Sequence, residues 1–265
     1  MASRRAIDLN SDIGESFGRW SLGNDAEVMR SVTSANVACG YHAGDPGVMR
    51  DTVRMAREAG VAVGAHPGFP DLAGFGRRNM SASPREVEDF VLYQIGALAA
   101  IAAAEGVRLQ HVKAHGALYN MAVRDRALAD AIARAVAAFD RSLVLFGLPA
   151  TELLRAGEAA GLRVAAEGFA DRAYEPDGSL TPRDRHGAVI HDAGAVVRRA
   201  VRMARDGVVT ATDGSDIPMP VDTICTHGDT PGSHELTRQL REGLERAGVA
   251  VRAVGAFLGV RANAG

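Results

Sequence analysis

The stretch Ala56-Arg-Glu-Ala-Gly60-Val-Ala-Val63 carries the pattern that decides the fold: the end of an Ala-rich helix, a glycine, and a β-branched run. A glycine just after a helix takes the left-handed conformation that ends the helix and turns the chain into a strand. The pattern recurs at residues 103–109, 158–164, 204–209 and 245–251. Such repeats are typical of the helix-to-strand step of a parallel sheet or barrel.

Other local signals place the remaining elements. Asp45 before Pro46 indicates a helix N-cap, and Ser83-Pro-Arg-Glu86 predicts a capping box. Asp213-Gly214 predicts a hairpin turn within 208–219. We expect one domain over residues 1–265, an α/β fold of the TIM-like (β/α) barrel type. Its expected strands lie near 6–11, 32–38, 61–65, 109–114, 142–147, 162–166, 187–190, 221–226 and 249–254.

Composition excludes several classes of function. The 265 residues are 47% hydrophobic and 23% charged, which fits a soluble domain with a sizeable core. The net charge of −2 offers no footprint for nucleic acid or an anionic membrane. The polar start predicts no secretion signal, and the apolar run 95–104 is too short to span a bilayer. Cys39 and Cys225 form no motif, so together with the missing signal they indicate reduced thiols in a cytoplasmic protein. We expect the partner to include a small-molecule substrate.

Lys113 is the only lysine among 30 basic residues, and it lies in the run His111-Val-Lys-Ala-His115. Arginine fills the sites where a positive surface charge is enough, so a remaining lysine suggests a compact point charge or an amine with a movable pKa. Chance survival in an arginine-rich composition is the simpler alternative. Because residues two apart in a strand share a face, both histidines are expected beside Lys113.

Most of the predicted strands end in polar or ionisable residues that local structure does not require. In a parallel barrel these ends lie on one rim, where such enzymes carry out their chemistry. A structural role is the better interpretation of any single residue, but the set predicts a common site. Its members are Asn10, Asp12, Glu15, His42, His66, Lys113, His115, Glu167, Asp171, Arg172, His227 and Asp229.

Three loop residues near these strand ends are candidates for substrate binding. Arg77 fits a carboxylate or phosphate, with a solvated surface arginine as the alternative. Tyr119 and Asn120 could orient a substrate, although Tyr119 is equally explained as an aromatic ring packed in the core.

Common cofactor and catalytic motifs are missing from the sequence. There is no Walker loop, Gly-x-Ser-x-Gly elbow, His-Glu-x-x-His or Cys-x-x-Cys motif. A divalent metal held by Asp12, His66 and His115 stays an open alternative.

Taken together, the motifs resemble the LamB/YcsF family, the A subunits of bacterial ATP-hydrolysing 5-oxoprolinases. Ser11, Ala114 and Gly168 depart from the usual pattern, and none of them removes an ionisable group. The matching runs are Asp8-Leu-Asn-Ser-Asp-Ile-Gly-Glu15, Ser34-Ala-Asn-Val-Ala-Cys-Gly-Tyr-His-Ala-Gly-Asp45, Gly64-Ala-His-Pro-Gly-Phe-Pro-Asp71, Gly74-Phe-Gly-Arg-Arg78, His111-Val-Lys-Ala-His-Gly-Ala-Leu-Tyr-Asn120, Phe169-Ala-Asp-Arg172 and Asp222-Thr-Ile-Cys-Thr-His-Gly-Asp229.

The resemblance implies a barrel of seven or eight strands, related to the polysaccharide deacetylases. It also implies hydrolysis of the lactam 5-oxo-L-proline to L-glutamate, coupled to ATP and carried out with separate B and C subunits. Such a reaction needs a base, a cation near the developing oxyanion and an anchor for the substrate carboxylate.

Our hypothesis assigns these roles to residues. Asp12 or His115 is the base, Lys113 the electrostatic partner of the oxyanion or phosphate, and Arg77 or Arg172 the anchor. A further group orients these residues or holds an ion: His42, His66, His227 and Asp229. The remaining substrate-binding candidates are Asn10, Glu15, Tyr119, Asn120 and Asp171.

Two alternatives remain open at this stage. The first is a metal-dependent deacetylase or amidohydrolase that acts without ATP. The second is a non-catalytic subunit that binds substrate and docks its partners.

Overall fold

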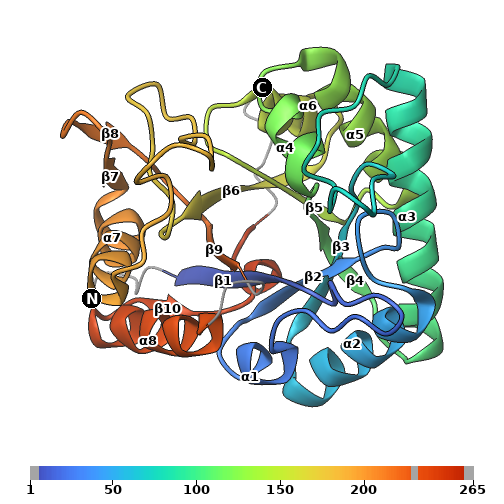
Figure 1. The fold of residues 1–265 in the computed structure, drawn as a ribbon, viewed down its shortest axis with the longest axis horizontal. Coiled ribbons are helices and arrows are strands. Elements are labelled where there is room, and N and C mark those ends of the chain that lie inside the picture. Colours follow the sequence, from blue (N-terminus) through green and yellow to red (C-terminus); the bar gives the residue numbers. More distant parts are fainter. Residues whose placement is uncertain (1–5, 228–231, 260–265) are drawn as a thin grey trace.

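The computed structural model, which describes residues 6–227 and 232–259, contains a closed barrel of parallel strands (Figure 1). Strand β9 pairs with both β6 and β1, and this double pairing closes the barrel. The β-barrel order is β1 (Ala6–Ile13), β2 (Ser34–Ala38), β3 (Ala62–His66), β4 (Leu109–Val112), β5 (Val144–Gly147), β6 (Arg163–Phe169) and β9 (Thr223–His227).

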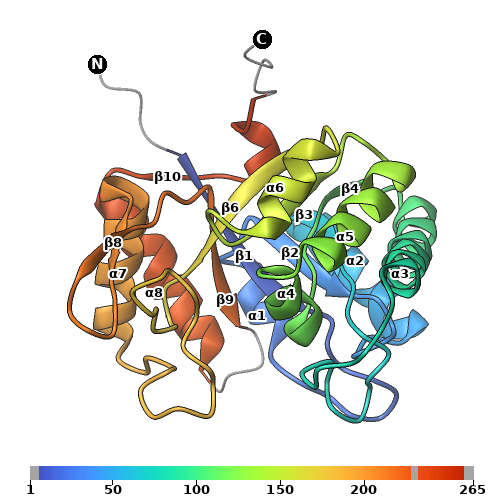
Figure 2. The ribbon, with the colours of Figure 1, turned by 90° about the horizontal axis from the view of Figure 1, so that it is seen from above.

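Helices surround the barrel (Figures 1 and 2). The longest, α3, has 21 residues and buries a stripe that includes Val87, Val91, Ile95 and Leu98 against its neighbours. Among described helices it alone is long and apolar enough to cross a membrane, yet here it packs on α5 and β3. The helices are α1 (Asp25–Met29), α2 (Pro46–Ala59), α3 (Pro84–Ala104), α4 (Gly116–Ala122), α5 (Arg126–Phe139), α6 (Glu152–Ala159), α7 (Ala193–Asp206) and α8 (Ser233–Arg246), with a 3₁₀ turn η1 (Val254–Ala256).

The helix ends confirm the local predictions. Asp45 caps α2 by accepting hydrogen bonds from the backbone N–H groups of Gly47 and Val48. Ser83 and Glu86 form the capping box of α3. Gly60 ends α2 with φ of 68°, in the left-handed region where a side chain would be strained. These ends form as expected because each depends only on residues a few positions apart.

One strand prediction was wrong, for a reason that barrel closure explains, and another was too long. Residues 187–190 form no barrel strand: Val189 makes only an isolated bridge to Arg172. The edge of β6 that such a strand would need is already paired with β9. Within the predicted 249–254, only β10 (Ala250–Val251) is a strand, and it pairs with the start of β1. The predicted hairpin is confirmed as β7 (Val208–Thr210) and β8 (Asp216–Pro218).

The inside of the barrel is polar along β1. Alternate residues of β1 point inward, and Asp8, Asn10 and Asp12 all make hydrogen bonds to side chains on other strands. Asp8, for example, accepts from Ser34 Oγ at 2.7 Å and from Thr223 Oγ1 at 2.6 Å. Burial raises the pKa of Asp8 to about 6 against the opposing effect of these hydrogen bonds. A hydrogen-bonded network therefore fills part of the barrel, and a small apolar cluster that includes Phe146, stacked on His111, is buried next to it. The main apolar core joins the strands to the surrounding helices.

The long segments that follow β1, β3 and β6 lie together at one end of the barrel, at the bottom of Figure 2. Backbone hydrogen bonds join two of these segments to their neighbours, from His115 N to Pro67 O and from Gly44 N to Ser16 O. This end carries the carboxyl ends of the strands, so the predicted rim exists as a physical surface.

The close approach of β3 to β4 gives a testable prediction. A Cβ at Gly64 would overlap the imidazole of His111 inside the barrel. We expect Gly64→Ala to lower the free energy of unfolding by about 1–3 kcal/mol, measured by urea denaturation. The control is Gly96→Ala in α3, where a Cβ meets nothing within 4 Å. It should leave stability unchanged or raise it by up to about 1 kcal/mol. Equal effects of the two substitutions would contradict the packing that we describe.

Candidate functional site

A cavity of about 1080 Å³ opens at this end of the barrel. Its floor holds ionisable side chains from three strand ends, and its walls come from α4 and from the segment 175–185 that follows β6. A cavity that joins a few convergent charged groups to a large open volume is the usual form of a small-molecule site. Of the sequence-predicted residues, those that line it are Asp12, His66, Arg77, Lys113, His115, Tyr119, Asn120 and Arg172.

Lys113 lies at the cavity floor as a buried cation. Its Nζ is 2.7 Å from Asp12 Oδ1 and 3.1 Å from Glu167 Oε1, with Cys225 Sγ at 3.0 Å. Burial by itself lowers the pKa of this amine, but the surrounding groups, Asp12 first, outweigh burial and hold the pKa well above its ordinary value. Lys113 is therefore a fixed positive charge, and the point-charge interpretation fits the structure better than an amine that loses its proton.

Asn36 and His111 fix the position of the Asp12 carboxylate. Asn36 Nδ2 donates to Asp12 Oδ1 at 2.8 Å, and Asn36 Oδ1 lies 2.7 Å from Nε2 of His111. Burial, followed by the charge of Lys113, lowers the pKa of His111 to about 3, so this ring is neutral and its Nε2–H donates to Asn36. The position of the Asp12 carboxylate is thus set by three strands.

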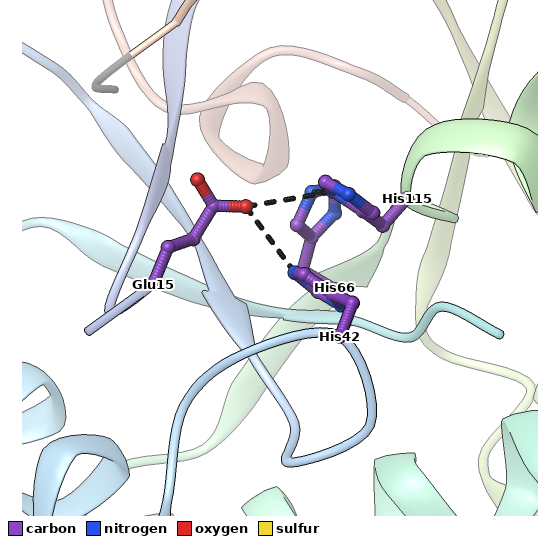
Figure 3. Close-up of side chains that lie close together, drawn as sticks. All are labelled: Glu15, His42, His66 and His115. Carbon is purple, nitrogen blue, oxygen red and sulfur yellow. Dashed lines mark hydrogen bonds and ion pairs between the residues drawn. The ribbon is translucent and has the colours of Figure 1, made fainter. Parts of the chain in front are cut away.

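Figure 3 shows a second group of side chains, Glu15, His42, His66 and His115. The group lies beside Asp12, whose Oδ2 is 3.4 Å from His66 Nε2. Glu15, His42, His66 and His115 are all buried, and each brings one potential ligand atom within 4.8 Å of the others. Glu15 Oε1 is 3.2 Å from His42 Nε2 and 3.5 Å from His115 Nδ1. The rings of His42 and His115 stack with centroids 3.7 Å apart. Burial and the neighbouring histidines lower the pKa values of His42 and His115 well below the ordinary value.

This cluster differs from the set considered from sequence. The open alternative named Asp12, His66 and His115 as metal ligands, with Glu15 left to the substrate. In the structure Asp12 Oδ1 is engaged by Lys113, and Asp12 Oδ2 lies 3.4 Å from His66 Nε2. Glu15 is the carboxylate closest to His42 and His115. No spacing rule could have shown this, because the four residues come from four separate segments of the chain.

The predicted anchors have different surroundings. The guanidinium carbon of Arg77 lies 4.9 Å from the centre of the Phe75 ring at the cavity wall. Arg172 donates to the carbonyl oxygens of Thr181 at 2.6 Å and Ala188 at 3.2 Å, so its guanidinium supports the segment that follows β6. Burial lowers the pKa of Arg172 to about 10, which leaves it positively charged at neutral pH.

Asn10 and Asp171, two of the other candidates, are not among the residues that line the cavity. Asn10 is buried beneath it and donates to Glu167 Oε1 at 3.1 Å and to Thr223 Oγ1 at 2.7 Å. Asp171 lines a separate small cavity of about 170 Å³ next to α8. His227 ends β9, where its backbone pairs with Asp12. The predicted residue Asp229 lies outside the described residues.

Tyr119, predicted from the sequence to orient substrate, lines the cavity, and the structure adds Glu167 beside Lys113. The Tyr119 hydroxyl and Glu167 Oε2 are buried without a hydrogen-bond partner among the described residues. Burial first, and the charge of Glu167 next, raise the pKa of Tyr119 well above its ordinary value. Glu167 was recognised from sequence only as a member of the polar strand ends, and its contact with Lys113 depends on the pairing of β6 with β9.

Comparison with known proteins decides the family. Residues 7–259 match the LamB/YcsF family. The chain belongs to this family, as the motifs indicated. The A subunit of the 5-oxoprolinase of Methylococcus capsulatus is 57% identical over 96% of this chain and 98% of that protein.

Solved structures agree with the family assignment. The structure of a lactam utilization protein from Thermus thermophilus is 53% identical, covers 94% of this chain and 99% of that chain, and has a TM-score of 0.90. A T48 deacetylase is 15% identical, covers 96% of this chain and 90% of that chain, and has a TM-score of 0.51, which is a likeness of fold alone. The predicted (β/α) barrel is confirmed, and its fold is like that of a deacetylase barrel.

The buried charges at the floor give a second prediction. Lys113→Met leaves Asp12 and Glu167 without their shared cation, and we expect a loss of about 3–5 kcal/mol in the free energy of unfolding. The double substitution Lys113→Met with Glu167→Gln removes one of the two uncompensated charges and should recover part of that loss. Arg30→Met serves as the control, because Arg30 pairs with Glu27 on the surface and should matter little. Urea denaturation of the three variants checks this, and a loss for Lys113→Met no larger than that for Arg30→Met would contradict it.

Proposed function

We propose that this chain is the A subunit of a cytoplasmic 5-oxoprolinase, which hydrolyses 5-oxo-L-proline to L-glutamate with ATP, in a complex with B and C subunits. The observation that carries the proposal is the similarity to proteins named as the A subunit of 5-oxoprolinase, with 57% identity over 96% of this chain for one of them. The similar structure from Thermus thermophilus is named a lactam utilization protein. Both cysteines are free and buried, which suits a reducing compartment.

The chemistry of a lactam fits the groups at the cavity floor. A five-membered lactam is a stabilised amide, so water attacks its carbonyl carbon slowly. Transfer of the terminal phosphoryl group of ATP to the lactam oxygen releases ADP and makes that carbon more reactive. Attack by one water then breaks the ring C–N bond and leaves an acyl phosphate, which a second water hydrolyses to glutamate and phosphate. Attack by water then needs a base that takes a proton and a positive charge near the oxygen. Asp12 and His115 line the cavity as acceptors of the proton, and Lys113 supplies the charge.

Lys113 acts in this scheme mainly by its charge and by its hold on Asp12. Its Nζ already donates to Asp12 Oδ1 and lies beside Glu167 and Cys225. An arginine at this position carries the same charge on a larger, planar group, which does not fit the same three neighbours. A buried point charge therefore explains why lysine is present where the rest of the chain uses arginine.

Arginines on the cavity walls are candidates for binding the anionic groups of the substrate. Arg77 and Arg172 are both candidates for the carboxylate anchor, and the Arg172 guanidinium also donates to backbone carbonyls. Arg124, Arg183 and Arg185 also line the cavity. A planar guanidinium binds carboxylate and phosphate oxygens in pairs, so this wall suits both the substrate carboxylate and a phosphoryl group. The missing Walker loop leaves two alternatives for the nucleotide: a site shared with the partner subunits, or an unfamiliar site.

The test is glutamate release from 5-oxo-L-proline by the purified chain, assembled with its B and C subunits, with and without ATP. We expect release only with ATP and all three subunits. Asp12→Asn should lower the rate by about 10²- to 10⁴-fold, the usual contribution of a general base. Lys113→Arg should also lower it strongly, and near-normal release by Lys113→Arg would remove the special role of the lysine.

Two further measurements distinguish this function from the alternatives. Release of acetate from an acetylated sugar without ATP, lost with a chelator, would identify a metal-dependent deacetylase instead. Full activity of the complex with Asp12→Asn and with His115→Ala would identify a non-catalytic subunit. His191→Ala is the control, since His191 is exposed and lies outside the cavity.

A further inference from the structure

The hydrogen bonds of His66 and His115 determine which of their nitrogens carry protons. His66 Nδ1 lies 2.8 Å from the carbonyl oxygen of Lys113, and His115 Nε2 lies 2.8 Å from the carbonyl oxygen of Phe75. A carbonyl oxygen only accepts hydrogen bonds, so we assign a proton to each of these two nitrogens. In the neutral rings, the other nitrogens then carry lone pairs.

Those two lone pairs face each other. His115 Nδ1 is 2.9 Å from His66 Nε2, and both rings are buried. Two acceptors at this distance repel each other, and burial keeps water from relieving the repulsion. A cation between them, either a proton or a metal ion, turns the repulsion into attraction.

The number of potential ligand atoms around this point favours a metal ion over a proton. A proton bridges two atoms, whereas Glu15 Oε1 and His42 Nε2 bring the total of ligand atoms to four within 4.8 Å of one another. Figure 3 shows the four side chains converging from separate segments. Asp12 Oδ2, 3.4 Å from His66 Nε2, adds negative charge beside the group.

We propose that Glu15, His42, His66 and His115 form a binding site for one divalent transition-metal ion of the Zn²⁺ type. Three imidazole nitrogens with one carboxylate oxygen are ligands that Zn²⁺, Co²⁺ and their neighbours accept, whereas Mg²⁺ and Ca²⁺ take oxygen ligands. The carbonyl groups of Lys113 and Phe75 hold the outer nitrogens of two ligands, as is common around metal-bound histidines.

Two of the ligands lie close to the positions that an ion requires. The rings of His66 and His115 are nearly perpendicular, with an interplanar angle of 89°, so one point can lie in both ring planes. Two nitrogens at Zn–N distances of about 2.0–2.1 Å and at the tetrahedral angle are about 3.3–3.4 Å apart. His66 Nε2 and His115 Nδ1 are 2.9 Å apart, so the two rings move apart by about half an ångström when an ion binds.

His42 must turn to complete the site. Its ring is parallel to that of His115, with an interplanar angle of 2°, so no ion lies in both planes. His42 Nδ1 has no hydrogen-bond partner among the described residues, and this leaves the ring without the outer hydrogen bond that holds the other two. His42 is therefore the ligand that binds last and contributes least.

The ion is reached from the cavity, since His66 and His115 line its floor. An ion bound there occupies the lone pair of His115, so Asp12 becomes the remaining candidate for the base. This consequence rests on the proposed function, but the binding site does not. A bound ion would supply Lewis-acid chemistry to a substrate in the cavity.

The test is metal binding by the purified full-length chain without partner subunits or ATP. After treatment with a chelator and dialysis, Co²⁺ is titrated into the protein and its visible ligand-field absorption recorded, followed by competition with Zn²⁺. We expect one Co²⁺ per chain with the spectrum of a nitrogen-bound ion, displaced by Zn²⁺ and unaffected by Mg²⁺. Elemental analysis checks the Zn²⁺ stoichiometry.

Variants assign the ligands. His66→Ala and His115→Ala should weaken Co²⁺ binding by more than about 100-fold, because loss of a ligand costs more than loss of its outer hydrogen bond. His42→Ala should weaken binding less, and the exposed His191→Ala should not change it. Circular dichroism spectra of all the variants establish that they are folded.

Two results would overturn the site: a wild-type chain that takes up no Co²⁺ or Zn²⁺, which would leave a shared proton between the rings, or unchanged binding by His66→Ala. Failure of the proposed function is distinguishable from both. A chain that binds the ion but gives no glutamate in the complex would refute the function alone. A complex that stays active while free of metal would refute only the role of the ion in the reaction.

Discussion

The ion cluster of Lys113 with Asp12 and Glu167 is the constraint on which the arrangement of this site depends. A buried ammonium is tolerated only where carboxylates lie within hydrogen-bonding distance, and here they lie at 2.7 Å and 3.1 Å. The three groups come from β1, from the end of β4 and from β6, which are far apart in the chain. They meet because β9 joins β6 to β1 and closes the barrel. Closure and the charged floor therefore require each other.

The polar interior extends this constraint through the barrel. Asp8, Asn10 and Asp12 alternate with Leu9 and Ser11 along β1, and each makes hydrogen bonds to neighbouring strands. A shift of the register by one residue would turn these groups toward the helices and leave them without partners. The network thus fixes the register, and the same register places Asp12 at the cavity floor. Stability and the position of the site have one physical origin.

The loops at the carboxyl ends of the strands add two further sets of ionisable side chains to the site. Arginines on the cavity walls suit anionic parts of a substrate, whereas the buried cluster of Glu15, His42, His66 and His115 suits a cation. The two regions meet at Asp12 and His66, whose side chains are 3.4 Å apart. In the proposed lactam hydrolysis, this division places the binding of negative charge at the mouth and the chemistry at the floor.

The sequence by itself was enough for the helix caps at Asp45 and Ser83, the left-handed glycine Gly60, the barrel class and the family. These features depend on neighbours within a few residues, or on motifs that keep their order along the chain. It also indicated that Asp12, His66, Lys113 and His115 share one rim. Only the tertiary structure decided that 187–190 stays outside the barrel, that Asp171 lines another cavity and that Glu15 joins the histidines. The physical reason is that strand pairing and loop packing bring together segments far apart in sequence, and local propensities carry no information about which segments meet.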